Sequence, residues 1–316
     1  MRKTMKKILI PFSLAIALLS QSAFAEKTTL MLDWFVNPDH GPIIVAKQKG
    51  LFKAQGLDID IKEPADPSMP PKLVAAGKFD LAVTYQPQLI RDVVEELPLV
   101  RVSTLIATPL NTLMVLAKNN YQSLADLKGK KIGFAFDGGL VNATIDTMLK
   151  KNGISIDDVE LINVGWSLSA SLAAGKVDAI YGAYRNFEMH QLAMEGFEGK
   201  GFYVEEEGVP SYDELIVVAN SKSVDKEMVA KFNAALELAT QYTVNHPDEA
   251  WELFKSYGDG KKLDTELNRL AWKDTLVRFA LRPKAADKAR YDNYAQFLVD
   301  NGVIKTKPDV NSYILD

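Results

Sequence analysis

The feature that most constrains the fold of this chain is an internal repeat, in which two stretches match two others about 98 residues further on. The stretch Val-Ala-Ala-Gly-Lys-Phe-Asp-Leu-Ala, which begins at Val74, matches Leu-Ala-Ala-Gly-Lys-Val-Asp-Ala-Ile, which begins at Leu172. Upstream, the glycine-stopped helix end and alternating strand that begin at Lys53 match those that begin at Lys151. A single Gly-Lys-x-Asp match could be an ordinary helix-to-strand turn. Two matches at nearly the same offset indicate a duplicated unit.

Each unit reads as strand, loop, helix, glycine, strand, helix, Gly-Lys-x-Asp turn and strand. This alternation is typical of a parallel β-sheet with helices on its faces, so the sequence predicts two similar α/β lobes. Ligands of such sheets bind where the strands end and the connections diverge. That rule selects three loops in each lobe, namely residues 33–40, 84–88 and 109–112 in the first and 137–142, 165–169 and 182–188 in the second.

Two apolar, strand-like segments lie where the chain leaves the first lobe and where it returns. They are residues 112–118 and 213–219, which we interpret as the two crossings of a hinge. Residues from Lys226 onward have helical periodicity and are predicted to pack on the first lobe. The expected division assigns residues 26–113 and 216–316 to lobe 1 and residues 114–215 to lobe 2.

The N-terminal segment predicts export. Residues 1–25 combine a basic start, an apolar run from Ile8 to Leu19 and small residues at alternating positions before Glu26, which is the pattern of a cleavable signal peptide. The apolar run is shorter than the roughly 20 residues that span a bilayer. The chain contains no cysteine that could carry a lipid or form a disulfide. We therefore expect a periplasmic protein that acts as a monomer.

Composition and motifs argue against several functions. The chain has 41 acidic and 37 basic residues, and four of the basic ones lie in the predicted signal peptide, so nucleic acid is not an expected partner. Glycine motifs of phosphate loops, dinucleotide-binding folds and hydrolase elbows do not occur. The three histidines, His40, His190 and His246, are far apart in the sequence and no thiol is present, so we expect neither a metal nor another cofactor.

Several longer motifs carry a family resemblance. Residues 30–59 read Leu-Met-Leu-Asp-Trp-Phe-Val-Asn-Pro-Asp-His-Gly-Pro-Ile-Ile-Val-Ala-Lys-Gln-Lys-Gly-Leu-Phe-Lys-Ala-Gln-Gly-Leu-Asp-Ile, residues 182–188 read Gly-Ala-Tyr-Arg-Asn-Phe-Glu, and residues 208–215 read Gly-Val-Pro-Ser-Tyr-Asp-Glu-Leu. They closely resemble the family that includes bacterial thiamine-pyrimidine-precursor binding proteins and the fungal thiamine pyrimidine synthase. The resemblance covers essentially the whole chain after residue 25.

This resemblance implies a two-lobed periplasmic-binding-protein fold of type II, with a hinge and with the ligand held between the lobes. It also implies a solute-binding component of an ABC importer. The small-molecule ligand would be a thiamine pyrimidine precursor, such as formylaminopyrimidine or hydroxymethylpyrimidine. The partner would be the importer's permease in the inner membrane.

On the first lobe we expect aromatic and hydrogen-bonding groups at the site. Trp34 follows the first strand, where its indole could stack on a planar heterocycle. Asp33 and His40 flank this residue, and each is equally compatible with a role in the turn alone. Tyr85 and Gln88 follow a later strand end, where a tyrosine can line a pocket and form a hydrogen bond at its rim.

On the second lobe, Tyr184, Asn186 and Glu188 alternate, so in an extended segment they would face one direction. Glu188 is the most informative of the three. Its carboxylate can accept paired hydrogen bonds from the exocyclic amine and a protonated ring nitrogen of an aminopyrimidine. A carboxylate at a helix start is, however, also favoured by the helix dipole in any protein.

Two further candidates lie on the second lobe. Asp137, Gly138 and Gly139 open a helix whose backbone amides could bind an anionic or carbonyl group of the ligand, although a plain structural turn explains them as well. Trp166 is a second aromatic candidate.

An enzyme is the alternative of a different class. The synthase branch of the family uses a lysine that binds pyridoxal phosphate and a histidine that supplies ring atoms, shortly after the Gly-Lys-x-Asp turn, together with a cysteine-rich iron-binding stretch. Thr84 and Gln88 stand at the corresponding positions here and no cysteine exists, so we do not expect synthase chemistry.

Other ligands remain open within the binding class, because related proteins reuse this architecture. Riboflavin, a sulfonate or another small heterocycle are the alternatives, and a sulfonate site would be rich in serine, threonine and arginine. In each case the expected mechanism is closure of the lobes about the hinge around an unaltered ligand.

Overall fold

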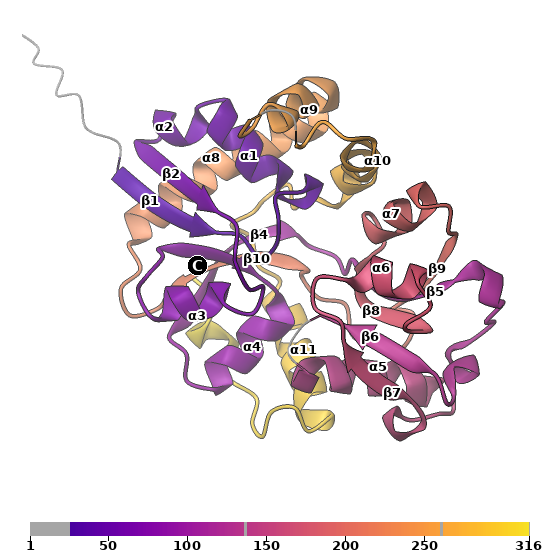
Figure 1. Ribbon diagram of the computed structural model, residues 1–316. Coiled ribbons are helices and arrows are strands. Elements are labelled where there is room, and N and C mark those ends of the chain that lie inside the picture. The colour runs from indigo at the N-terminus through magenta and orange to yellow at the C-terminus, as the bar shows by residue number, and fades with distance from the viewer. Residues whose placement is uncertain (1–25, 136–137, 260–261, 316) are drawn as a thin grey trace, which may run out of the picture.

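The computed structural model describes residues 26–135, 138–259 and 262–315. The predicted signal peptide and Asp137 therefore lie outside the described residues. Two five-stranded sheets form the centre of the fold, and helices cover their faces (Figure 1). In the described part of the chain, no helix combines the length and the apolar character that crossing a bilayer requires.

The first sheet has the strand order β2-β1-β3-β10-β4. β1 runs parallel to β2 and β3, whereas β10 is antiparallel to both β3 and β4. The bounds are β1 (Glu26–Met31), β2 (Leu57–Lys62), β3 (Leu81–Thr84), β4 (Leu99–Ile106) and β10 (Leu215–Asn220).

The second sheet has the order β7-β6-β8-β5-β9, which corresponds to the first sheet position by position. β6 runs parallel to β7 and β8, and β5 is antiparallel to β8 and β9. The bounds are β5 (Asn111–Leu116), β6 (Lys131–Phe134), β7 (Glu160–Asn163), β8 (Ala179–Tyr184) and β9 (Gly199–Tyr203). The prediction of two similar α/β units is confirmed.

Each sheet is mixed, because antiparallel strands join the predicted parallel ones. The segments that we interpreted as hinge crossings form β5 and β10, and each pairs as an antiparallel strand inside a sheet. Their backbone groups are buried, so pairing within a sheet supplies the hydrogen bonds that a bare connection would lack. Strands of the first sheet come from residues 26–106 and 215–220, and strands of the second from residues 111–203. The lobe boundaries given above remain our proposal.

The repeated Gly-Lys-x-Asp turn has the same structural role in both units. Gly77 and Gly175 have φ angles of 68° and 67°, a left-handed conformation that lets the chain leave a helix at little steric cost. Asp80 accepts a hydrogen bond from the backbone N–H of Thr29 at 2.7 Å, and Asp178 accepts one from the N–H of Lys131 at 2.9 Å. Each aspartate thus ties its turn to the neighbouring strand.

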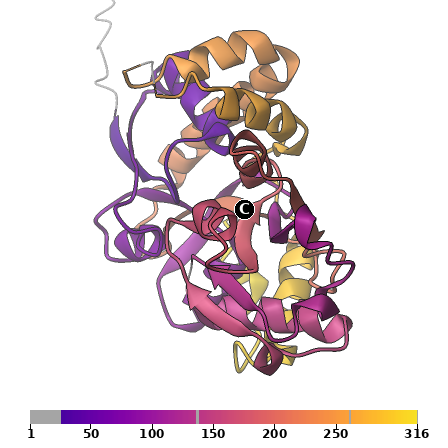
Figure 2. The same cartoon turned by 45° about the vertical axis from the view of Figure 1, so that its right-hand side comes forward.

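One face of the first sheet packs against helices from both ends of the chain. Leu30 and Leu32 lie in this core, whereas Met31 lies in the core on the opposite face, as the two-residue period of a strand requires. α8 and α9 lie beside α1 in both views (Figure 1, Figure 2), which confirms for these two helices the prediction that they pack on this unit. The bounds on this face are α1 (Gly41–Gln48), α2 (Leu51–Ala54), α8 (Lys226–Asn245), α9 (Pro247–Lys255) and α10 (Glu266–Thr275).

The core on the opposite face continues from the first unit into the second. It includes residues of both sheets together with Tyr291 and Tyr294 of α11. The remaining helices are α3 (Pro70–Ala75), α4 (Gln86–Val94), α5 (Gly138–Lys151), α6 (Leu168–Ala173), α7 (Glu188–Met194) and α11 (Lys288–Asp300).

Candidate ligand-binding site

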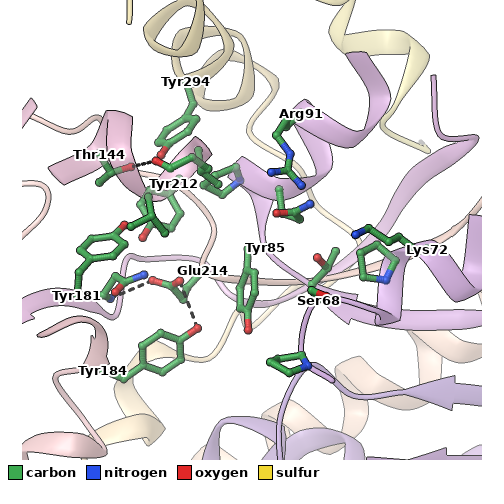
Figure 3. A pocket seen from close by; sticks show the side chains of 18 residues that line it. Ser68, Lys72, Tyr85, Arg91, Thr144, Tyr181, Tyr184, Tyr212, Glu214 and Tyr294 are labelled. Carbon is green, nitrogen blue, oxygen red and sulfur yellow. Dashed lines mark hydrogen bonds between the residues drawn. The ribbon is translucent and has the colours of Figure 1, made fainter. Parts of the chain in front are cut away.

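Two neighbouring cavities lie between the two units, and Tyr85 and Tyr184 line both of them. We call the smaller one the tryptophan compartment. It encloses about 430 Å³, including space open to solvent, and Asp33, Trp34 and Glu188 are among its lining residues. We call the larger one the tyrosine compartment. It encloses about 780 Å³ on the same measure (Figure 3).

Asp33 is held rigidly at the end of the first strand. The chain turns there into a short 3₁₀ helix (Pro38–His40), which Asn37 caps. The Nδ1 atom of His40 accepts a hydrogen bond from the backbone N–H of Asn37 at 3.2 Å, so the proton lies on Nε2, which donates to Asp33 Oδ1 at 2.9 Å. The hydroxyl of Tyr85 donates to Asp33 Oδ2 at 2.8 Å. Both carboxylate oxygens of Asp33 therefore have fixed partners.

Tyr85 is fixed by the start of a helix. It is the N-terminal capping residue of α4, directly after β3. Burial, followed by the nearby charge of Asp33, raises the pKa of the Tyr85 hydroxyl well above its usual value of 10. The hydroxyl is therefore a hydrogen-bond donor at any physiological pH.

Aromatic side chains from both units meet at the rim of the tryptophan compartment. The ring centroids of Trp34 and Trp166 are 4.0 Å apart with an interplanar angle of 46°. Phe35 lies 4.6 Å from Trp166, centroid to centroid, and about half of its surface is exposed. Because Trp34 belongs to the first unit and Trp166 to the second, this cluster joins the units at the mouth of the compartment.

The wall from the second unit is formed by the end of β8 and the start of α7. Glu188 Oε2 accepts a hydrogen bond from the backbone N–H of Tyr184 at 2.6 Å. Burial raises the pKa of the Glu188 carboxyl to about 7, despite the hydrogen bonds from backbone N–H groups, which lower it. Near neutral pH this carboxyl can therefore exist in either protonation state.

The prediction that Tyr184, Asn186 and Glu188 face one direction is wrong. Residues 185–187 form a turn between β8 and α7, so the segment is not extended there. Asn186 instead reaches the first unit, where its Nδ2 donates to Asp39 Oδ1 at 2.6 Å and to the hydroxyl of Thr275 at 2.8 Å. Asn186 does not line the tryptophan compartment, but its partner Asp39 does.

Asp39 is a site residue that the sequence analysis missed. It lines the tryptophan compartment and is almost fully buried. Burial raises its pKa to about 6, although the charge of His40 and the hydrogen bonds from Asn186 and Thr275 lower it. The only sequence signal was its place inside the resemblance motif, between Trp34 and His40.

Most of the predicted first-lobe and second-lobe residues come together. Asp33, Trp34, Tyr85, Tyr184 and Glu188 line the tryptophan compartment, and Gln88 lines the tyrosine compartment.

The remaining predicted residues lie outside these walls. His40 is fully buried behind Asp33. Gly138 and Gly139 begin α5, next to Leu140 of the tyrosine compartment, and Asp137 lies outside the described residues.

Glu214 is a second acidic residue that the sequence analysis missed, and it lies in the tyrosine compartment. Its Oε2 accepts hydrogen bonds from the backbone N–H groups of Leu110 at 2.6 Å and Asn111 at 3.1 Å, and the hydroxyl of Tyr184 donates to its Oε1 at 3.3 Å. Burial raises the pKa of Glu214 to about 7. Glu214 belongs to the motif at 208–215. It was not predicted as a site residue because it directly precedes an apolar strand that we interpreted as a hinge crossing.

Among the described residues, no group of three or more histidine, cysteine, aspartate or glutamate side chains is arranged to hold a metal ion.

The two matching sheets, with cavities between them, define the class of this protein: it has the periplasmic-binding-protein fold. The alkanesulfonate-binding protein SsuA of Xanthomonas axonopodis pv. citri, solved with bound MOPS, superposes with a TM-score of 0.70 at 16% identity, over 92% of this chain and 98% of that chain. The model of the NMT1/THI5-like family matches residues 37–250, and the chain belongs to this family.

Curated relatives are similar over different lengths. A putative thiamine biosynthesis protein of Haemophilus influenzae is 52% identical over 99% of both chains. A formylaminopyrimidine-binding protein of Halalkalibacterium halodurans is 38% identical over 71% of this chain and 68% of its own. A 4-amino-5-hydroxymethyl-2-methylpyrimidine phosphate synthase of Aspergillus parasiticus is 27% identical over 86% of this chain and 83% of its own.

Proposed function

We propose that this protein is the periplasmic solute-binding component of an ABC importer and that it binds a small aminopyrimidine, a precursor of the thiamine pyrimidine, in the tryptophan compartment. The observation that carries the proposal is the pairing of Trp34 from one unit with Glu188 from the other across this one cavity. Recognition of a flat heterocycle needs an aromatic ring that stacks on its face and a polar group that forms hydrogen bonds with its edge.

The protonation of Glu188 suits an aminopyrimidine. A carboxyl with a pKa of about 7 can share one proton with a ring nitrogen whose own pKa is similar, and its second oxygen accepts from the exocyclic amine. Asp33 and Asp39 add further acceptors to the same compartment. The similarity to a protein named for binding formylaminopyrimidine supports the same ligand class.

The composition of the compartment argues against a sulfonate. Asp33, Asp39 and Glu188 line it, and neither lysine nor arginine is among its described lining residues. An anionic headgroup there would face carboxylates in a poorly solvated cavity, where like charges repel strongly.

The residues at the expected synthase positions argue against the enzymatic alternative. Thr84 and Gln88 line the tyrosine compartment where a pyridoxal-phosphate lysine and a donor histidine would be needed. A threonine cannot form the imine that anchors pyridoxal phosphate. We therefore propose binding without chemistry.

Export and delivery complete the proposal. The segment 1–25 would direct the chain to the periplasm and then be removed. Closure of the two units around the ligand would create the shape that the permease recognises.

Calorimetric titration of the mature protein tests this function. We expect hydroxymethylpyrimidine or formylaminopyrimidine to bind, and riboflavin and taurine not to bind. Glu188→Gln should weaken binding of the pyrimidine by about 10-fold to 100-fold, because it removes the shared proton and leaves a ligand group unsatisfied. Glu206→Gln, an exposed carboxylate outside both compartments, is the matched control. Binding of taurine or riboflavin with no binding of either pyrimidine would overturn the proposal.

A further inference from the structure

A second cavity between the units adjoins the tryptophan compartment. Tyr85 and Tyr184 line both compartments, so the tyrosine compartment adjoins the tryptophan compartment at these two side chains. It is also the larger of the two, at about 780 Å³ against about 430 Å³. A single pyrimidine ring in the tryptophan compartment would leave this space unused.

Five tyrosines from several elements line the tyrosine compartment. Tyr85 comes from the first unit, Tyr181 and Tyr184 come from β8, Tyr212 comes from the chain just before β10, and Tyr294 comes from α11. Figure 3 shows Tyr181, Tyr184, Tyr212 and Tyr294 on the side of the cavity where Glu214 lies, with Tyr85 between that side and the opposite wall. Cages of aromatic rings recognise organic cations through cation–π contacts.

Two polar side chains on this side, those of Glu214 and Asn111, offer hydrogen-bond acceptors. The carboxyl of Glu214 is buried among the tyrosines. The side chain of Asn111 lines the same compartment with 9% of its surface exposed, and its Oδ1 has no hydrogen-bond partner among the described residues. A buried acceptor without a donor is costly, so a ligand that brings positive charge or N–H groups would stabilise this side.

Positive side chains lie on the opposite wall. Lys72 of α3 is exposed, and Arg91 of α4 lies 3.3 Å from Asp92 and 3.6 Å from Glu95, measured from guanidinium nitrogen to carboxylate oxygen. Figure 3 shows Lys72 and Arg91 on the far side of Tyr85 from Glu214. The end of the cavity beside Glu214 therefore presents aromatic rings and acceptors, with these cations across the cavity.

We propose that the tyrosine compartment is a second ligand subsite, which accepts a flat, positively charged ring joined to the aminopyrimidine. This inference rests on the proposed function, because the pyrimidine in the tryptophan compartment would anchor the second ring. The ligand class then includes two-ring molecules of the thiamine type, in which one methylene joins an aminopyrimidine to a cationic thiazolium ring. The second ring would lie among the tyrosines, with its charge beside Glu214.

Three probes in calorimetric titrations separate this inference from the proposed function. They are hydroxymethylpyrimidine, thiamine, and 4-amino-5-benzyl-2-methylpyrimidine, a neutral two-ring analogue. We expect thiamine to bind at least about tenfold more tightly than hydroxymethylpyrimidine, because cation–π contacts are strong in a desolvated cage. The neutral analogue should bind less tightly than thiamine.

A filling substitution tests the location. Leu140 lies in the first turn of α5, is partly buried and lines the tyrosine compartment, so Leu140→Trp should fill the space and reduce the affinity ratio of thiamine to hydroxymethylpyrimidine to about one. Leu238→Trp is the matched control on the exposed surface of α8, where Leu238 is 52% exposed. The thermal midpoint of each variant reports whether it folds.

The possible results lead to different conclusions. Thiamine that binds no more tightly than hydroxymethylpyrimidine overturns the second subsite, and so does an unchanged ratio in folded Leu140→Trp. A neutral analogue as tight as thiamine overturns the preference for a cation. Absence of binding of both hydroxymethylpyrimidine and formylaminopyrimidine overturns the proposed function itself, whatever thiamine does.

Discussion

Buried carboxyl groups are the main electrostatic feature of this protein at the scale of single residues. Asp39 and Glu188 line the tryptophan compartment, Glu214 lines the tyrosine compartment, and burial raises the pKa of each, to about 6, 7 and 7 respectively. Asp92 of α4, which is also buried, has a pKa raised to about 6. These groups hold protons in the folded state that they would release in the unfolded chain.

The pH dependence of stability follows from these pKa values. Between about pH 4.5 and 7 the folded state binds more protons than the unfolded state, so the free energy of unfolding of the ligand-free protein should fall as pH rises through this window. One raised carboxyl contributes on the order of 1 to 3 kcal/mol. We therefore expect the melting temperature to fall by several degrees from pH 5 to pH 8.

Variants identify the groups responsible. Glu188→Gln removes one titrating carboxyl and should flatten this slope, whereas Glu206→Gln on the surface should leave it unchanged. A melting temperature that rises steadily from pH 5 to pH 8 in the wild-type protein would contradict this assignment. Calorimetric melting in buffers of matched ionic strength makes the measurement.

At the scale of elements, α7 and α10 connect the two units. Asn186, just before α7, donates to Asp39 and to Thr275 at the end of α10. His190 within α7 lies 2.7 Å from Asp274, from Nε2 to Oδ2. The first contact is buried and the second is partly exposed. Asp39 thus belongs both to the lining of the tryptophan compartment and to the buried contact between the units.

We expect Asn186→Ala to favour an open arrangement. The substitution leaves the buried carboxyl of Asp39 without its donor from the second unit, which costs about 1 to 3 kcal/mol in the closed arrangement. Ligand affinity should fall accordingly, by about tenfold or more. His190→Ala should change affinity much less, because a partly exposed ion pair contributes little. Small-angle scattering with and without ligand, together with titration, makes the comparison. Equal scattering profiles and affinities for Asn186→Ala and the wild type would rule out this effect.

The elements also show what the sequence could predict. The loops 33–40, 84–88 and 182–188 were placed at the site by a topological rule, because carboxyl ends of parallel strands gather at one edge of a sheet. The rule does not select Glu214 and Tyr212, because they precede an antiparallel strand. In the sequence this strand resembles only an apolar hinge segment. Asn186 was misplaced because alternation predicts direction only where the backbone is extended, and residues 185–187 turn.

At the scale of the whole molecule, the repeat explains how a cavity forms between the units. Two units with the same strand order face each other, and each incorporates one strand of a crossing segment, β10 in the first sheet and β5 in the second. A chain that passes twice between two such units allows them to rotate about the crossings while each keeps its own sheet. The contacts of Trp34 with Trp166 and of Asn186 with Asp39 show the units in contact across the cavity.

The central claim is that an aminopyrimidine binds between Trp34 and Glu188. A crystal structure of the mature protein grown with hydroxymethylpyrimidine tests it most directly. We predict density for the ring in the tryptophan compartment, with the indole of Trp34 against its face and a carboxyl oxygen of Glu188 within about 3 Å of its amine or ring nitrogen. Density for the ring at any other place on the protein, with this compartment empty, would contradict the account.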